Sequence, residues 1–407
     1  MRDFMDYVLT AFHHKTGWNV DNSYASLTTT ANNLLDFNVP HGLSLHVSSL
    51  SSPNFATSYT LGSKGVVDGS LSFLYTSLGL NVTSRSSHIP LANLVRGYRH
   101  LQHLSLPKGK ALNDVQDGGT SIAGDGRKDT LLYGRLYLPS SSLEALYLRR
   151  LSPNRLLRLN CVSDATLPSG GTVLALLQND FGKYTTEYLY STDSSLLGFR
   201  ALYNFGYDPR YPLDQQHVSS RPARHPWDHQ NGRLSAGAEA YFSPINKSGG
   251  ISTGLRFTTL PIHTGFPYTM TLTLNPLMGN LSSSYAVKAG PNLSLCSRFD
   301  FNVYSYESDV SLGLELWQLS RPRVPEEVAW VKDLIRPGWE PKVAPEKVVP
   351  DEDVTGVLKA RMTDKGKVGV VWECRLKELL VTLGAGLDLK KRDSVVGKFG
   401  LEVAYSS

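Results

Sequence analysis

The chain has 407 residues, of which 41% are hydrophobic and 19% charged, and its mean hydropathy is −0.20. The charged share is below the roughly 25% of typical soluble domains. The negative mean hydropathy excludes a bundle of membrane helices, and no uncharged apolar run approaches the roughly 18 residues that a spanning helix needs. The net charge of +5 is scattered, with no basic run of the kind that binds nucleic acid.

Cysteine usage and the first residues indicate where the protein is made. Cys161, Cys296 and Cys374 lie far apart without a CxxC pair, which argues against a disulfide scaffold or zinc knuckle and fits a reducing compartment. The N-terminus lacks a secretory signal. Its acidic residues Asp3 and Asp6 also argue against a matrix presequence, which is poor in acids. A membrane barrel without an export signal is expected in mitochondria or plastids.

Residues 1–16 have the pattern of an amphipathic helix. Its apolar residues share one face at i, i+4, i+8 spacing and are Phe4, Met5, Val8, Leu9 and Phe12. An ordinary packing helix would show the same pattern. We expect a plug inside a lumen, or a contact surface.

After about residue 40 the apolar period becomes two. In 268–275, Met270, Leu272 and Leu274 alternate with threonines, and in 380–389 five apolar residues alternate with Thr, Gly and Asp. Runs of 8 to 11 residues match tilted strands that cross a bilayer. Two runs are ambiguous because both parities carry Leu, namely 143–150 and 172–178. We expect about nineteen strands, at 41–48, 55–61, 66–76, 131–138, 143–150, 156–162, 172–178, 184–190, 197–205, 233–242, 251–258, 268–275, 283–289, 298–303, 309–316, 355–362, 367–377, 380–389 and 396–405.

The polar parity of these strands distinguishes a membrane barrel from a soluble sandwich. Its residues are mostly Gly, Ser and Thr, whereas the wet face of a sandwich is usually rich in Lys and Glu. The apolar parity carries almost no charge, as lipid requires, because Lys or Arg at the midplane costs about 2–4 kcal/mol. Aromatic residues near strand ends resemble an interfacial girdle; they are Tyr184, Tyr188, Tyr190, Tyr203, Phe205, Trp317 and Tyr405.

These patterns predict an all-β fold, a transmembrane β-barrel, as a single domain over 1–407. Residues 1–40 form an N-terminal helical segment, expected in the lumen, and 41–407 form the barrel. Three long interruptions are expected on one rim, where binding functions collect; they are 77–130, 206–232 and 320–353, the last with a short helix from Val328 to Ile335.

Charged residues on the polar parity are expected to face the lumen. They are Arg200, Arg233, Arg256, Arg298, Arg375 and Lys398, with Glu239, Asp300, Glu315, Glu373 and Glu402. Charge pairs in a solvated lumen explain them, and an ion path is the alternative. The signs are mixed, so strong ion selectivity is not implied.

The last strand carries a local signal. Residues 398–405 read KFGLEVAY, which places a polar residue, a glycine and two hydrophobic residues at Lys398, Gly400, Val403 and Tyr405. This pattern resembles the sorting signal of mitochondrial β-barrels. An unpaired final strand is a template for strand addition, which gives the assembly machinery something to recognise. The pattern is loose, and its position at the end of the chain gives it weight.

Catalytic and metal motifs are missing. The sequence has no HExxH or GxxxxGK[ST] motif. Residues Asn113 to Gly124 resemble a calcium loop but lack an acid at the third position and the final Glu. His225 and His229 flank Pro226 in a Pro-rich stretch, so we expect loop histidines, not metal ligands. We expect no enzyme activity, no cofactor and no metal.

Several segments together resemble the fungal mitochondrial distribution and morphology protein 10 family. They read MRDFMDYVLTAF, NSYASLTTTANNLLDF, FATSYTLGSKGVVDGSLSFLYTS, LLYGRLYLPSSSLEALYLRRLSP and QNDFGKYTTEYLYSTDSSLLGFRALYNFG. The similarity covers essentially the whole chain. The N-terminal segment and YLPSSSLEALYLRRLSP are specific to this family among barrels.

The resemblance implies a nineteen-stranded barrel of the mitochondrial outer membrane, related to the mitochondrial porin, with its N-terminal segment in the lumen. It implies two roles. The first is anchoring the ER–mitochondria encounter structure, with maintenance of mitochondrial morphology protein 1 and distribution and morphology proteins 12 and 34, which tethers the organelles and supports phospholipid exchange. The second is assisting the sorting and assembly machinery in the biogenesis of the translocase.

Partners are expected at rim loops and at stripes on the lipid-facing side. The candidate partner-binding residues are Leu71, Phe73 and Tyr75 on an early strand and Phe299, Phe301 and Val303 on a later one. Plain contact with membrane lipids is the alternative for each. A porin-like solute channel is the alternative function for the whole protein.

Overall fold

The three-dimensional structure is a computed structural model. It describes residues 1–63, 67–80, 82–101, 104, 129–167, 169–206, 232–261, 263, 265–319, 354–390 and 396–407. The long interruption 206–232, apart from its two ends, and the interruption 320–353 lie outside the described residues, as do the expected helix at 328–335, the stretch 113–124, His225 and His229.

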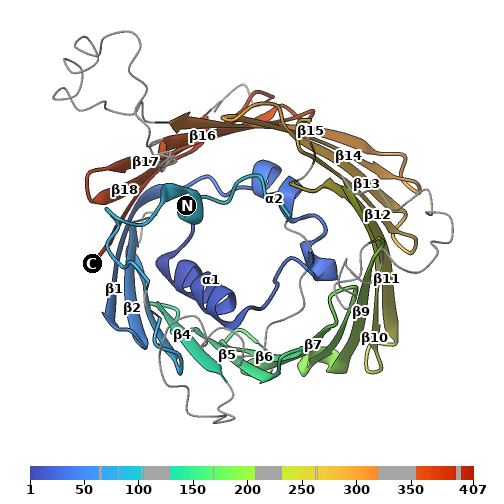
Figure 1. The fold of residues 1–407 in the computed structure, drawn as a ribbon, viewed down its shortest axis with the longest axis horizontal. Coiled ribbons are helices and arrows are strands. Elements are labelled where there is room, and N and C mark those ends of the chain that lie inside the picture. Colours follow the sequence, from blue (N-terminus) through green and yellow to red (C-terminus); the bar gives the residue numbers. More distant parts are fainter. Residues whose placement is uncertain are drawn as a thin grey trace, which may run out of the picture.

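Nineteen strands of the described residues form one sheet that closes into a barrel (Figure 1). Neighbours in sequence pair antiparallel, and the barrel closes where β1 pairs parallel with β19. An odd number of alternating strands requires one such parallel pair. The strands are β1 Gly42–Ser52, β2 Phe55–Ser63, β3 Val67–Thr76, β4 Thr130–Leu138, β5 Leu143–Ser152, β6 Arg155–Ser163, β7 Gly171–Asp180, β8 Tyr184–Ser191, β9 Leu196–Asn204, β10 Gly232–Ser243, β11 Ser248–Thr259, β12 Tyr268–Asn275, β13 Asn280–Lys288, β14 Leu293–Asn302, β15 Ser308–Leu319, β16 Val354–Thr363, β17 Lys367–Leu376, β18 Leu379–Asp388 and β19 Val396–Ser406.

The predicted alternation is confirmed, and every predicted strand is present. On β12, Met270 and Leu272 are exposed on the outside while Thr269 and Thr271 are buried. The two ambiguous runs are also strands. In β5 and β7 one set of leucines faces outward and the other, which includes Leu148 and Leu176, is buried inside the barrel.

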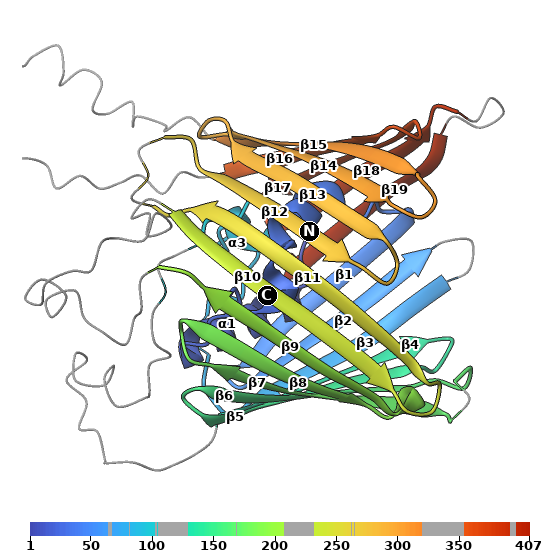
Figure 2. The ribbon, with the colours of Figure 1, turned by 90° about the vertical axis from the view of Figure 1, so that its right-hand side faces the viewer.

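The two rims of the barrel differ in their connections. β3, β9 and β15 all end at the same rim, which we call the long-loop rim, because the three long interruptions predicted from the sequence begin there. The opposite rim, where β1 begins, is the hairpin rim. Figure 2 shows the barrel from the side, with its strands inclined to the axis. The expectation that the long interruptions share a rim is confirmed for their starting points.

The N-terminal segment lies inside the barrel (Figure 1). It contains α1 Phe4–Thr16, the short 3-10 helix η1 Tyr24–Ser26 and α2 Thr29–Leu35. A further short helix, α3 Leu91–Leu94, follows β3, and a 3-10 turn, η3 Asp193–Ser195, precedes β9. No helix of the described residues is long and apolar enough to cross a membrane, a finding that does not concern spanning by strands.

Two predicted positions are corrected. Val303 was placed on a strand, but β14 ends at Asn302 and Val303 lies in the following turn, where its N–H donates to the carbonyl of Gly279 at 2.8 Å. Trp317 was placed in an outer aromatic girdle, but it lies on the inner parity of β15 and packs against the core around α1. A tryptophan near a strand end serves equally well on either side, so its residue type did not reveal the side.

Candidate functional site: the occupied lumen

Helix α1 packs on the inner wall by its apolar face. Phe4, Met5, Val8 and Phe12 are buried, and Phe12 is 0% exposed. They form one hydrophobic cluster with inner-parity leucines of four neighbouring strands, which are Leu74 of β3, Leu131 of β4, Leu148 of β5 and Leu156 of β6. The expected plug is confirmed. The leucines on both parities of 143–150 indicated this packing. A strand that faces lipid outside and an apolar helix face inside must be apolar on both sides.

The segment after β3 also enters the lumen, which corrects the expectation that all of 77–130 lies on the rim. Leu80, Ile89, Leu91, Leu94 and Val95 join the cluster around α1. The backbone N–H of Arg2 donates to the carbonyl of Leu94 at 2.8 Å. This segment enters the lumen because its apolar residues are buried against α1 there instead of remaining in water.

Inner-wall cations hold this second segment by its backbone. Lys359 Nζ donates to the carbonyl of Arg96 at 2.7 Å, and the guanidinium of Arg375 donates to the carbonyls of Ser87 and Ile89. The carboxylate of Glu315 accepts the N–H of Tyr98 at 3.0 Å. Residues 86–98 therefore satisfy their backbone polar groups partly through the barrel wall and partly through the short helix α3.

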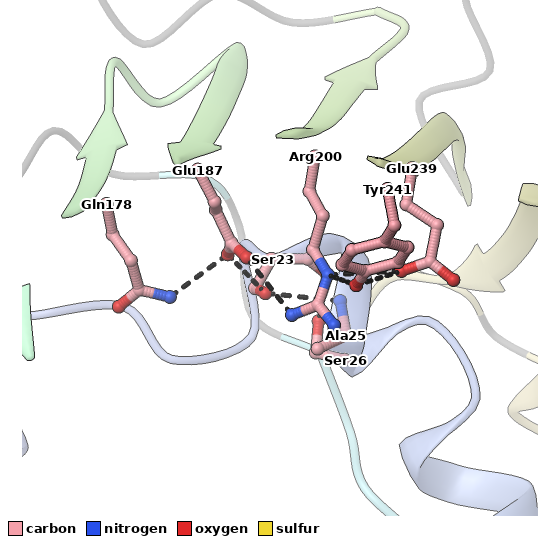
Figure 3. Close-up of polar contacts among 8 residues, drawn as sticks. All are labelled: Ser23, Ala25, Ser26, Gln178, Glu187, Arg200, Glu239 and Tyr241. Carbon is pink, nitrogen blue, oxygen red and sulfur yellow. Dashed lines mark hydrogen bonds and ion pairs between the residues drawn. The ribbon is translucent and has the colours of Figure 1, made fainter. Parts of the chain in front are cut away.

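A polar network joins the N-terminal segment to β7, β8, β9 and β10 (Figure 3). Ser23 Oγ donates to Glu187 at 2.6 Å, and Gln178 donates to the same carboxylate oxygen at 3.0 Å. The guanidinium of Arg200 lies 3.6 Å from Glu187 and 3.1 Å from Glu239. Tyr241 bridges the two residues, accepting from Arg200 at 2.6 Å and donating to Glu239 at 2.9 Å.

Further ion pairs line the wall. Arg298 contacts Asp36 of the N-terminal segment at 2.7 Å and Asp300 at 3.2 Å. On the facing side His46 pairs with Glu402 at 2.8 Å. Glu373 contacts both Lys359, at 3.5 Å, and the amino group of Met1. The expected inward direction of the charged residues is confirmed. Charge pairing is confirmed for six of them, which are Arg200, Glu239, Arg298, Asp300, Glu373 and Glu402.

The sequence reasoning missed Glu187, Lys359 and Arg361 among the inner charges. Glu187 and Lys359 are each 2% exposed. Parity could have found Glu187, since it alternates with the outward Tyr184, Tyr188 and Tyr190 on β8.

Small residues on the inner parity leave room for the N-terminal segment. A Cβ on Gly313 would lie 2.8 Å from the carbonyl oxygen of Leu34, one on Gly384 would lie 2.5 Å from Cδ of Pro40, and one on Gly400 would lie 2.5 Å from the carbonyl carbon of Pro40. These distances are shorter than any tolerated Cβ contact. The glycine-rich polar face is therefore shaped by contact with the segment that precedes β1.

His13 makes the docking of α1 dependent on pH. Burial, together with the nearby Arg158, lowers the pKa of His13 from 6.5 to about 4. The docked helix therefore binds fewer protons than the undocked one between these values, so docking weakens as the pH falls from 6.5 toward 4.

We expect the amides of α1 to exchange hydrogen faster at pH 5 than at pH 7, after correction for intrinsic rates. His13→Gln should remove most of this difference. His14→Gln, at an exposed neighbouring position, serves as the control and should preserve it. An unchanged pH dependence in the His13 variant would contradict the assignment.

The candidate partner-binding residues form two separate stripes on the outer surface. Phe73 and Tyr75 are 42% and 47% exposed near the long-loop rim, and Leu71 of the same strand is half-buried. Phe299 is 44% exposed near the hairpin rim. Phe301 is half-buried beside it, and Val303 lies beyond the strand. β3, between β2 and β4, and β14 stand on roughly opposite sides of the barrel (Figure 1), so the structure does not bring the two stripes together.

The residues of the predicted sorting signal divide between the two faces of β19. Lys398 and Gly400 lie on the inner parity, and Val403 and Tyr405 lie on the outer one, opposite Leu45 and Val47 of β1. In the closed barrel both edges of β19 are paired, with β1 and β18. A sorting receptor can therefore pair with this strand only before closure. The role as a signal stays a prediction.

The described residues contain no group of three or more His, Cys, Asp or Glu side chains that could hold a metal ion. All three cysteines are free, and Cys296 and Cys374 are buried. The inner wall and the plug consist of structural ion pairs and packed apolar side chains.

A closed barrel with an apolar outer surface and an occupied lumen defines the protein as a β-barrel membrane protein. The family model described as Mitochondrial distribution and morphology protein 10 matches residues 1–335 and 334–407. The chain belongs to this family. It is 58% identical over 407 residues to a protein of that name from Phaeosphaeria nodorum, with both chains covered completely. It is 55% identical over 416 residues to one from Sclerotinia sclerotiorum and 43% identical over 449 residues to one from Podospora anserina, again with complete coverage.

Proposed function

We propose that the chain is a barrel of the mitochondrial outer membrane that acts by docking other proteins. In one role it anchors the ER–mitochondria encounter structure, whose other subunits are maintenance of mitochondrial morphology protein 1 and distribution and morphology proteins 12 and 34, and so serves phospholipid exchange and mitochondrial inheritance. In the other it joins the sorting and assembly machinery and assists translocase biogenesis. Its family is named for mitochondrial distribution and morphology, which supports a role in organelle shape.

The occupied lumen is the observation that favours a docking function over solute transport. Two chain segments cross the interior and are held by buried contacts, including Phe12 at 0% exposure and Glu187 at 2%. Segments packed in the lumen narrow the path that a solute would take, as in barrels whose interior is plugged by loops or a helix. The porin-like alternative predicts a steady, large conductance, and its test is described in the Discussion.

The positions of the two outer stripes support two docking surfaces. One lies near the long-loop rim on β3 and the other near the hairpin rim on β14, on roughly opposite sides of the barrel. Aromatic side chains supply large contact areas at low entropic cost, which is why they dominate binding hot spots. Membrane lipids cover the rest of the outer surface.

We expect Phe73→Ala combined with Tyr75→Ala to reduce recovery of at least one of the two complexes in affinity purification from mitochondria. The loss of a buried aromatic anchor typically costs about 2 kcal/mol or more of binding free energy. The matched control is Tyr188→Ala with Tyr190→Ala, an equally exposed aromatic pair on β8. Recovery of both complexes intact from the Phe73 and Tyr75 variant would show that these residues contact only lipid.

A further inference from the structure

Two arginines face outward near the long-loop rim, one on β5 and one on β6. Leu148 and Leu156 are buried inside the barrel. Because side chains alternate along a strand, their chain neighbours Arg149 and Arg155 lie on the outer surface. Arg149 is the register partner of Leu157, so Arg155 is its diagonal neighbour on the same face, within reach of a long side chain. We call Arg149 and Arg155 the arginine pair.

No carboxylate faces the arginine pair from the strands around it. Strands β5 to β9 are described in full, and none of their outward residues is Asp or Glu. Nε of Arg149 is buried and has no acceptor within the described residues. Arg155 is exposed. Basic side chains at the edge of a lipid-facing surface attract anionic headgroups, so the arginine pair is suited to a negatively charged lipid.

An apolar groove on the outer surface adjoins the arginine pair. It crosses the adjacent strands β6 to β10 and has a volume of about 580 Å³, and pockets of about 300–1,000 Å³ are typical of small-ligand sites. Ala175 and Ala240 contribute small side chains to its lining, among larger ones such as Phe199. Leu157 lines the groove and is also the register partner of Arg149. The arginine pair therefore lies at the β6 end of the groove.

We propose that the arginine pair and the groove bind one anionic phospholipid, with its phosphate between the two guanidinium groups and an acyl chain in the groove. The guanidinium fork matches the geometry of a phosphate, and two guanidinium groups can share its oxygens. The groove is continuous with the lipid-facing surface, so an acyl chain enters it directly from the bilayer. This site needs only a lipid-facing barrel and is independent of the docking roles proposed above.

The site is expected to discriminate between phospholipids by their net charge. A zwitterionic headgroup brings a cationic group to a surface where the outward residues of β5 to β9 offer no carboxylate to pair with it. An anionic headgroup has no such cation, and each basic residue near the membrane surface adds to its attraction. Anionic lipids should therefore be preferred over zwitterionic lipids that have the same acyl chains.

Native mass spectrometry of the full chain, released from detergent micelles, tests this preference. The probes are dioleoyl phosphatidylglycerol and dioleoyl phosphatidylcholine, which share their acyl chains and differ in net charge. We expect one phosphatidylglycerol to be retained per barrel under conditions that remove phosphatidylcholine. Equal retention of the two lipids by the unaltered protein would overturn the proposal.

Two kinds of variant test the two parts of the site. Arg149→Gln combined with Arg155→Gln should weaken retention of phosphatidylglycerol about tenfold or more, because both arginines contribute to the attraction. Ala175→Phe fills the groove and should also weaken retention, although both charges stay in place. The matched control is Lys377→Gln, which removes an exposed cation next to β17 on the same rim, outside the groove, and should leave retention unchanged. Undiminished retention in either the arginine variant or the groove variant would contradict the site.

Discussion

Replacing Gly400 by alanine is expected to block assembly of the barrel into the membrane. Gly400 belongs to the predicted sorting signal on β19, which must pair with the assembly machinery before it pairs with β1. In the closed barrel the new Cβ would also lie 2.5 Å from the carbonyl carbon and 2.6 Å from the carbonyl oxygen of Pro40. Overpacking of this kind costs about 1–3 kcal/mol in a well-packed interior. Import into isolated mitochondria, followed by carbonate extraction, measures the membrane-integrated fraction.

Gly384→Ala separates recognition from packing. A Cβ at Gly384 would lie 2.5 Å from Cδ of the same proline, but Gly384 is on β18, outside the signal. We expect Gly384→Ala to integrate and to be less heat-stable, whereas Gly400→Ala fails to integrate. If both variants integrate equally well, Gly400 is needed only for its contact with Pro40, and it has no part in sorting.

Replacing Phe12 by alanine is expected to release α1 from the inner wall and raise the ion conductance of the barrel. Phe12 is 0% exposed and packs in the apolar cluster with Leu131 and Leu148. Truncation of a buried phenylalanine costs about 3–5 kcal/mol of stability. This is a large share of the free energy that docking of a short helix can contribute. In planar bilayers the unaltered protein should show low conductance, and the variant should show frequent larger openings.

Thr10→Ala is the matched control on the same helix. Its side chain is exposed and donates to the carbonyl of Asp6 at 2.8 Å, so its removal leaves the packing against the wall intact. The conductance of this variant should equal that of the unaltered protein. A steady, large conductance already present in the unaltered protein would contradict the docking function and favour the porin-like channel.

The repeating features of the barrel could be predicted from the sequence because they are local. Lipid on one side of each strand and a polar interior on the other impose alternation, so the sides of Met270, Arg200 and Val403 follow from parity alone. The amphipathic pattern of residues 4–12 likewise predicted a helix with one buried face. The ends of individual strands were harder to predict. Val303, for example, was assigned to a strand that ends one residue earlier, at Asn302.

The contents of the lumen could not be predicted in the same way, because they depend on contacts between residues far apart in sequence. Nothing local to Leu91 or Leu94 shows that they pack on α1, and nothing local to Ser23 shows that it meets Glu187, which lies more than a hundred residues away. The inward side of Trp317, by contrast, follows from its parity on β15, opposite to that of the outward Leu312 and Leu316.

The sequence by itself therefore determined the strands, their two faces and the presence of an amphipathic N-terminal helix, since each is imposed residue by residue by the solvent on either side. Only the tertiary structure decided what fills the barrel. The residues after β3 and the inner leucines of β4 to β6 meet around α1 in the barrel, and these contacts join residues that lie far apart in the sequence.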